Sequence, residues 1–186
     1  MIEAQLPSYE RASALIEAYL ENLSWFFRPV DREQIIEELL PSIYKKSSGQ
    51  PTMPILINPE GDSSSQSRSQ AVDVHDLSLL LIVFAVGAVA DMTLPPDNDE
   101  ANLYYHLCRA TMSLQSILDD TKLTTVQTIA LMGAYDLFSC REATLEGAWK
   151  LLTIAMCLAS SVSNFLLYCS ARSQLIGICN VLGWLA

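Results

Sequence analysis

Residues 77–90 read LSLLLIVFAVGAVA, and these fourteen residues carry no charged side chain. His75 and Asp76 precede this stretch, and Asp91 follows it. A transmembrane helix needs about 20 apolar residues, so the stretch is too short to cross a bilayer. It instead predicts a helix that is buried on most of its sides, with Asp76 as its N-cap and residues 94–96 (LPP) as its end.

Apolar residues on either side of this stretch recur at steps of three and four, which is the period of an α-helix. The periodicity predicts helices over residues 8–27, 31–41, 99–118 and 124–138, and a further helix that begins near Thr144. No strand-like alternation of apolar and polar residues occurs. We therefore predict an all-α fold, a bundle of about six or more helices in antiparallel hairpins with a long Ser/Pro-rich loop.

Several residues indicate where these helices begin, end and face the core. Ser8 is expected to be the N-cap of the first helix, and Pro41 is expected to end the second. Residues 25–27 (WFF) are expected to pack the first two helices together. The pairs with capping-box spacing are Asp31 with Gln34 and Thr124 with Gln127. The predicted apolar stripes are Leu103, Leu107, Ala110, Leu114 and Ile117 in one helix, and Leu145, Ala148, Trp149, Leu152, Ala155 and Met156 in another.

Composition divides the chain into four parts. Residues 1–44 form an N-terminal helical part, and residues 73–161 form the main helical part. Between them, residues 45–72 contain seven Ser, three Pro and two Gly, which is typical of a flexible linker or a long surface loop. Residues 162–186 form an atypical apolar tail.

The charge and the cysteines exclude several classes of function. The chain has 11 Lys and Arg against 21 Asp and Glu, a net charge of −10, so it repels phosphate and is not expected to bind nucleic acid directly. Its five cysteines are widely spaced and form no C-x-x-C motif. This pattern predicts free thiols in a reducing compartment and neither a disulfide framework nor a zinc site.

Catalytic motifs are also missing from the sequence. There is no G-x-S-x-G and no glycine-rich phosphate loop. His75 and His106 lie on separate predicted elements. We expect His75 to cap the first turn of its helix, and His106 to pack against neighbours or lie on the surface. Asp119 and Asp120 are adjacent residues of a polar turn, which seldom converge on one substrate atom. We predict no catalytic, cofactor-binding or metal-binding residue, and we predict that the chain is not an enzyme.

The segment after Lys150 permits another interpretation. Residues 151–171 carry no charge, and their length would allow a membrane span. Thr153, Ser160 and Ser161 interrupt the apolar character, and the amphipathic pattern that reaches Met156 favours a soluble helix. A small membrane-anchored protein therefore remains an alternative, and we do not favour it.

Several short stretches, taken together and in this order, resemble one family. They are residues 6–12 (LPSYERA), 25–30 (WFFRPV), 38–44 (ELLPSIY), 75–80 (HDLSLL), 94–96 (LPP), 125–128 (TVQT) and 148–152 (AWKLL). Their combination resembles the fungal-specific transcription factor domain of fungal zinc-cluster transcription factors, also called the middle homology or xylanolytic activator regulatory domain. The resemblance covers roughly residues 6–161 apart from the linker.

The resemblance implies an all-helical regulatory domain of a nuclear protein that acts through contacts with protein partners, with a small-molecule effector as a further expectation. In this family a separate module, with six cysteines around two zinc ions, reads DNA. That module is absent from this sequence, so zinc and DNA binding are assigned to none of its residues. The alternative is a helical interaction adaptor unrelated to transcription, although we see no fixed 34-residue repeat.

The sequence departs from the family at its end. The family normally continues into a Gly-Leu-His-Arg-Asp-like motif, whereas this chain runs into residues 162–165 (VSNF) and an almost uncharged tail. We hypothesise that the residues from about 162 are translated from a retained intron or a shifted frame. The preceding helices would then lack part of their packing surface, and we expect association through exposed apolar area.

Overall fold

The computed structural model describes residues 5–47, 73–95, 98–114, 121–139 and 144–166. Every regular element in these ranges is a helix, which confirms the predicted all-α fold. The proposed linker and tail lie outside the described residues, apart from their first few positions, which belong to helices. The elements are α1 (Tyr9–Asn22), the π-helical η2 (Gln34–Leu39), α2 (Leu40–Ser47), α3 (Val74–Ala90), α4 (Asp99–Met112), α5 (Leu123–Phe138) and α6 (Thr144–Leu166).

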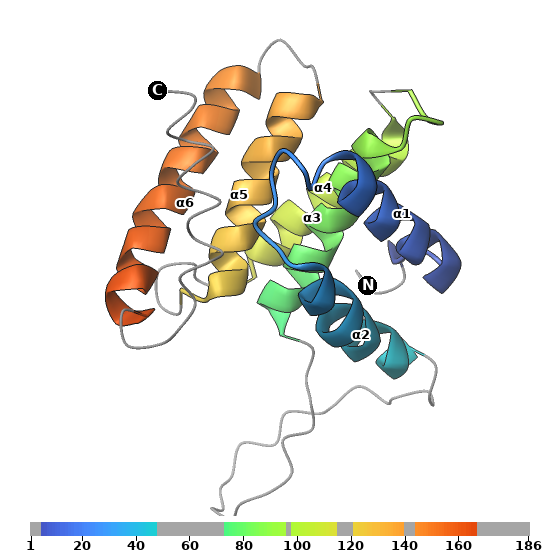
Figure 1. The fold of residues 1–186 in the computed structure, drawn as a ribbon, viewed down its shortest axis with the longest axis horizontal. Coiled ribbons are helices and arrows are strands. Elements are labelled where there is room, and N and C mark those ends of the chain that lie inside the picture. Colours follow the sequence, from blue (N-terminus) through green and yellow to red (C-terminus); the bar gives the residue numbers. More distant parts are fainter. Residues whose placement is uncertain (1–4, 48–72, 96–97, 115–120, 140–143, 167–186) are drawn as a thin grey trace, which may run out of the picture.

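The centre of the fold is α3, which contacts α1, η2, α4 and α5. Every residue from Leu77 to Ala88 is buried, as the uncharged stretch predicts (Figure 1). The expected N-cap is wrong, however, because Asp73 takes this role instead of Asp76. Asp73 has the extended backbone that an N-cap requires, and its Oδ1 accepts a hydrogen bond from the His75 N–H at 3.0 Å.

α1 crosses α3 at a point where the two backbones nearly touch. A Cβ atom added to Gly87 would lie 2.1 Å from the carbonyl oxygen of Leu15, so only glycine fits there. Beside this crossing, Arg11 of α1 donates hydrogen bonds to Asp91, which follows α3, and to Glu100 of α4. One guanidinium therefore links three segments of the chain.

α3 and α4 form a helical hairpin that is fastened by Asn98. Its Oδ1 accepts from the N–H of Ala101 at 2.7 Å, which caps α4. Its Nδ2 donates to the carbonyl oxygen of Ala88 at 3.0 Å, near the end of α3. A single amide side chain therefore satisfies backbone groups of both helices.

The stripe predicted to bury α4 is the wrong one. Leu103 and Leu114 are 42% and 64% exposed, whereas Tyr104 and Cys108 are buried. The buried stripe has the same spacing but is shifted by one residue, so periodicity alone does not distinguish the two. Packing against α3 decides between them, since Tyr104 meets Phe84 edge to face at 5.6 Å between ring centroids.

Local side chains end α1 earlier than the periodicity predicts. Ser8 caps the helix as expected, accepting from the N–H of Arg11 at 3.3 Å. α1 then stops at Asn22, where Trp25 Nε1 donates to the Asn22 carbonyl at 2.8 Å and Ser24 donates to the Leu20 carbonyl at 2.6 Å. These bonds satisfy carbonyl groups that a longer helix would have bonded itself.

The predicted end at Pro41 is also wrong, because α2 continues through it to Ser47. The turns just before this proline are widened into the π-helix η2, in which Leu40 N–H bonds to the carbonyl of Ile35. Proline has no N–H, and its ring collides with the carbonyl four residues earlier in an ordinary helix. A wide π-turn in front of Pro41 lets the chain stay helical.

α5 and α6 form the second hairpin, and α6 lies at the outer edge of the fold (Figure 1). The capping box expected at Thr124 and Gln127 does not form, since α5 begins at Leu123 after Lys122 and has no side-chain cap. Gln127 instead donates to the carbonyl of Pro29 at 2.9 Å and pairs with Gln34 of η2. The Gln127 side chain therefore forms hydrogen bonds to distant parts of the chain and does not cap α5.

Candidate functional site

Residues with catalytic or metal-binding chemistry do not gather in the described part of the chain. No group of three or more His, Cys, Asp or Glu residues there could hold a metal ion. His75 is buried at the start of α3, and His106 is exposed on α4. Asp119 and Asp120 lie outside the described residues.

The two described cysteines differ in environment. Cys108 is fully buried, and burial raises the pKa of its thiol, so it stays protonated and inert. Cys157 is exposed on α6. Both are free thiols, as predicted, and the other three cysteines lie outside the described residues.

A buried polar junction joins the first turns of α3 and α5. His75 Nδ1 and Thr125 Oγ1 are hydrogen-bonded at 3.0 Å, and Lys122 forms an ion pair with Asp73. Burial raises the pKa of Asp76 beside this junction, and the charge of Asp73 adds to the effect. His75 and Thr125, and Lys122 and Asp73, are each other's partners, so the junction holds two helix ends together and does not resemble a substrate site.

All six basic side chains that the structure describes are already engaged. Five of them form ion pairs with carboxylates, and the sixth, Arg109, lies over the ring of Tyr105 at 5.9 Å. The five paired residues are Arg11, Arg28, Arg32, Lys122 and Lys150. The described surface therefore offers little free positive charge to a phosphate backbone.

The unusual surface of the molecule is on α6. This helix packs mainly against α5, through an inner stripe that includes Ala148, Leu152 and Ala155, as predicted. Leu145, Trp149 and Met156 were predicted to face the core but are 70%, 50% and 40% exposed. The α6 outer face consists of the exposed residues of this helix, which are Leu145, Glu146, Trp149, Lys150, Thr153, Ile154, Met156, Cys157, Ser160 and Ser161.

The hydroxyl groups of this face do not make it polar. Thr153 donates to the carbonyl of Trp149 at 2.8 Å, and Ser160 donates to that of Met156 at 2.9 Å. Ser161 donates to the carbonyl of Cys157 at 3.2 Å. Because each hydroxyl proton is already bonded within the helix, these three hydroxyl groups can lie against apolar groups without losing a hydrogen bond. The charged groups of the face are Glu146 and Lys150, which pair with each other.

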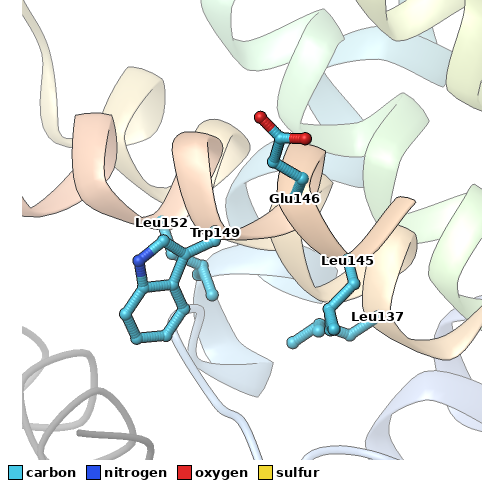
Figure 2. Close-up of a pocket in the computed structure, with 5 residues that line it drawn as sticks. All are labelled: Leu137, Leu145, Glu146, Trp149 and Leu152. Carbon is cyan, nitrogen blue, oxygen red and sulfur yellow. The ribbon is translucent and has the colours of Figure 1, made fainter. Parts of the chain in front are cut away.

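A shallow apolar pocket lies at the beginning of this face, between the end of α5 and the start of α6. It has a volume of about 470 Å³ and is lined by Leu137, Leu145, Glu146, Trp149 and Leu152. Figure 2 shows the Trp149 indole and the Leu145 and Leu137 side chains around it, while the Glu146 carboxylate points away from them. Glu146 instead pairs with Lys150 at 2.7 Å.

Two further exposed aromatic residues adjoin the end of α5. Phe27 is buried, as expected for the WFF run, but Trp25 and Phe26 are 80% and 46% exposed. Phe26 meets Phe138 edge to face at 5.9 Å, and Phe138 follows Leu137 of the pocket directly. The exposed aromatic residues and the pocket therefore share the C-terminal end of α5.

Length and composition also bear on α6. Among the described helices, the segment Leu145–Val162 is long and apolar enough to cross a membrane, and α3 is apolar but shorter. The core helix of a soluble protein passes the same test, so the property by itself assigns no location.

Comparison with known proteins gives one match. A family model described as the fungal specific transcription factor domain matches residues 16–164, from within α1 to near the end of α6. No curated protein matches the chain. No solved structure matches it either.

Proposed function

This chain belongs to the fungal specific transcription factor domain family, and from that premise we propose that it regulates transcription in the nucleus through contacts with other proteins. The observation that carries the proposal is the family match across residues 16–164. The match includes both helical hairpins and the whole of α3, so it concerns the folded unit and not an isolated motif.

The charges of the molecule support protein partners over direct contact with DNA. The chain carries a net charge of −10, and its described basic side chains are paired with carboxylates or lie over an aromatic ring. Binding to DNA depends on basic groups that displace counterions from phosphates. We therefore propose that DNA is read by a zinc-cluster module elsewhere in the parent protein, as in other members of the family.

We also propose that the chain has no catalytic role. Transcription factor domains of this family regulate and do not catalyse, and in the described part His75 is committed to Thr125. A small-molecule effector fits within the proposal, because the pocket beside Trp149 is concave and apolar.

The proposal is tested by tethering the chain to a promoter. The chain is fused to a heterologous DNA-binding domain, alone or together with an activation segment, and reporter transcription is measured in fungal cells. We expect the chain to raise the first reporter or lower the second, outside the scatter of replicates. Gly147→Ala, at a helix position where the added methyl group would make only an ordinary contact with Asp136 Oδ2 at 3.5 Å, should leave this effect intact.

A second variant distinguishes regulation by the folded domain from a nonspecific effect of fusing a bulky segment to the DNA-binding domain. Gly87→Asp should unfold the domain and abolish the effect, with immunoblots and microscopy to confirm that the fusion is still made and nuclear. If the folded, nuclear fusion leaves both reporters unchanged, the regulatory function is wrong. The interaction adaptor unrelated to transcription would then become the better interpretation.

A further inference from the structure

We infer that residues 175–185 of this chain turn back after α6 and pack as a helix, antiparallel to α6, on the uncharged part of the α6 outer face. That part consists of Thr153, Ile154, Met156, Cys157, Ser160 and Ser161. The inference goes beyond the proposed function and does not rest on it. It is carried by the chemistry of the described face and by the sequence that follows α6.

The uncharged part of the α6 outer face suits an apolar neighbour. Residues 151–166 carry no charge, because the ion pair of Glu146 and Lys150 lies before them on the helix. The side chains of Ile154 and Met156 are exposed, and the three hydroxyl groups of this part donate to carbonyl groups of α6 itself. A neighbour that packs here therefore removes apolar surface from water and displaces no hydrogen bond of the protein.

The sequence after α6 has the pattern of a helix that packs along one side. Residues 167–186 lie outside the described residues, so this pattern is read from the sequence alone. Apolar residues recur there at steps of three, four and three, at Leu175, Ile178, Leu182 and Leu185. This spacing is that of a helix that packs along another helix. Gly177 and Asn180 interrupt the apolar character of the opposite side, which also carries Trp184.

The reach of this segment matches the length of the face. Residues 167–174 are eight residues, half of them polar, and connections of about two to eight residues join antiparallel neighbours in helical bundles. The stripe from Leu175 to Leu185 is about 15 Å long at a rise of about 1.5 Å per residue. The uncharged part of the face, from Ser161 back to Thr153, is about 12 Å long at the same rise.

Attachment and charge favour this segment over a second copy of the chain. A segment joined to α6 by a short connection is present at an effective concentration of about a millimolar, whereas a second copy must associate from solution. A second copy also brings another net charge of −10, whereas residues 167–186 bring one charge, that of Arg172, which has the opposite sign. The apolar area that was expected to cause association would then be covered within one chain. A partner protein would reach this part of α6 only after the segment has left it.

Two native thiols report on the contact. Cys157 is at the middle of the uncharged part of the face, and Cys179 is next to the middle of segment 175–185. The purified full chain is labelled with N-ethylmaleimide, and the rate at each cysteine is followed by mass spectrometry of its peptides. The contact protects both thiols, so we expect both to label about tenfold or more slowly than in a variant whose segment is released. Cys108 is fully buried and should stay unlabelled in every folded protein.

A matched pair of variants in the segment makes the result specific. Leu182→Glu places a charge in the packing stripe and should release the segment, so that Cys157 labels about tenfold or more faster than in the wild type. Asn180→Glu places the same charge on the opposite side of the segment and should leave the rate at Cys157 unchanged. Equal rates at Cys157 in the wild type and in folded Leu182→Glu would overturn the inference.

A variant of the face tests the contact from the α6 side. Thr153→Glu changes an exposed side chain, so circular dichroism should show an intact fold, and it should accelerate the labelling of Cys179 by about the same factor. This variant also provides a second test if Leu182→Glu reduces folding. A rate at Cys179 that Thr153→Glu leaves unchanged would overturn the inference.

Other occupants of the face have their own signatures. We expect the protected wild type to be a monomer in sedimentation velocity. Protection of Cys157 that is lost on dilution, together with a dimer, would assign the cover to a second copy. Flotation of the chain with neutral phosphatidylcholine vesicles would assign it to a membrane, and either result overturns the contact within one chain. The tethered reporters test regulation separately, so the proposed function and this inference fail independently.

Discussion

α3 and α6 are both apolar helices, yet they meet different surroundings. α3 contacts four other elements, and its residues from Leu77 to Ala88 are all buried. α6 is longer and contacts mainly α5, so that Trp149 and Ile154 remain about half exposed. The two helices look alike in composition and differ in the number of neighbours that cover them.

The difference shows what an uncharged stretch specifies. It specifies that the helix needs apolar surroundings, because hydration of its side chains is unfavourable. It does not specify whether those surroundings come from the same chain or from a partner. α3 finds them within the fold, whereas one side of α6 stays exposed among the described residues.

The largest difference in the free energy of unfolding is expected when one aromatic side chain is removed from each helix. Phe84→Ala in α3 should lower the free energy of unfolding by about 4 kcal/mol, because Phe84 is fully buried against Tyr104 and would leave a cavity. Trp149→Ala in α6 should cost less than about 1 kcal/mol, since half of the side chain already faces water. Urea denaturation followed by circular dichroism measures both. Similar losses for the two variants would mean that α6 is as integral to the core as α3.

A second test concerns the closest contact of α3. Gly87→Ala should lower the free energy of unfolding by about 3 kcal/mol, because the new methyl group would lie 2.1 Å from the backbone oxygen of Leu15 and would force α1 away. The matched control is Gly147→Ala in α6, where the nearest atom is Asp136 Oδ2 at 3.5 Å. That change should be neutral or stabilise by up to about 1 kcal/mol through helix propensity. Thermal unfolding of the two variants in opposite directions would confirm the contrast, and equal melting temperatures would contradict it.

Much of the helical architecture was predictable because local signals determine it. The uncharged stretch 77–90 and the cap at Ser8 depend on neighbours in sequence, and both are confirmed. The errors occur where distant groups intervene. Gln127 does not cap its own helix, because its side chain donates to the carbonyl of Pro29. The chain stays helical through Pro41, because the preceding turns widen into the π-helix η2.

The candidate site was less predictable for a related reason. Leu145, Trp149 and Met156 have the spacing of a core stripe, and nothing in that spacing reveals that no element of the described fold covers them. For the same reason the buried stripe of α4 was predicted wrongly, since Leu103 is exposed and Tyr104 is buried. Periodicity identifies an apolar side of a helix, whereas coverage depends on which elements pack there. The proposed frame shift of the tail stays a prediction, because residues 167–186 lie outside the described part.

A smaller effect is expected at the main interface of α6 within the described residues, which it forms with α5. Gly133→Ala in α5 would place a methyl group 2.9 Å from Leu152 Cγ, a contact that a flexible side chain relieves in part. We expect a loss of about 1 kcal/mol, well below that at Gly87. In a Leu152→Ala background the clash with Leu152 is gone, and the backbone oxygen of Ala148 at 3.3 Å is the close contact that remains, so the same change should cost less. A double-mutant cycle by urea denaturation measures this reduction, and additive effects would show that the two residues do not meet.

The smallest expected effect compares the ion pairs of the two regions. The guanidinium of Arg11 holds the pKa of Glu100 below its ordinary value, so Glu100 stabilises the fold above a pH of about 4.3, and this contribution is lost as the pH falls through the lowered pKa. Glu100→Gln should therefore cost about 0.5 kcal/mol at pH 7 and less at pH 3, which lies below the ordinary pKa of a glutamate. The control, Glu146→Gln, removes a pair within α6 itself, whose two side chains are 69% and 81% exposed, and should change stability within error at both pH values. Urea denaturation of the three proteins at each pH measures these differences. If Glu100→Gln costs as much near pH 3 as at pH 7, the Glu100 side chain stabilises the fold by packing and not by its charge. If Glu146→Gln costs more than Glu100→Gln, electrostatics stabilise α6 more than they stabilise the junction of α1, α3 and α4.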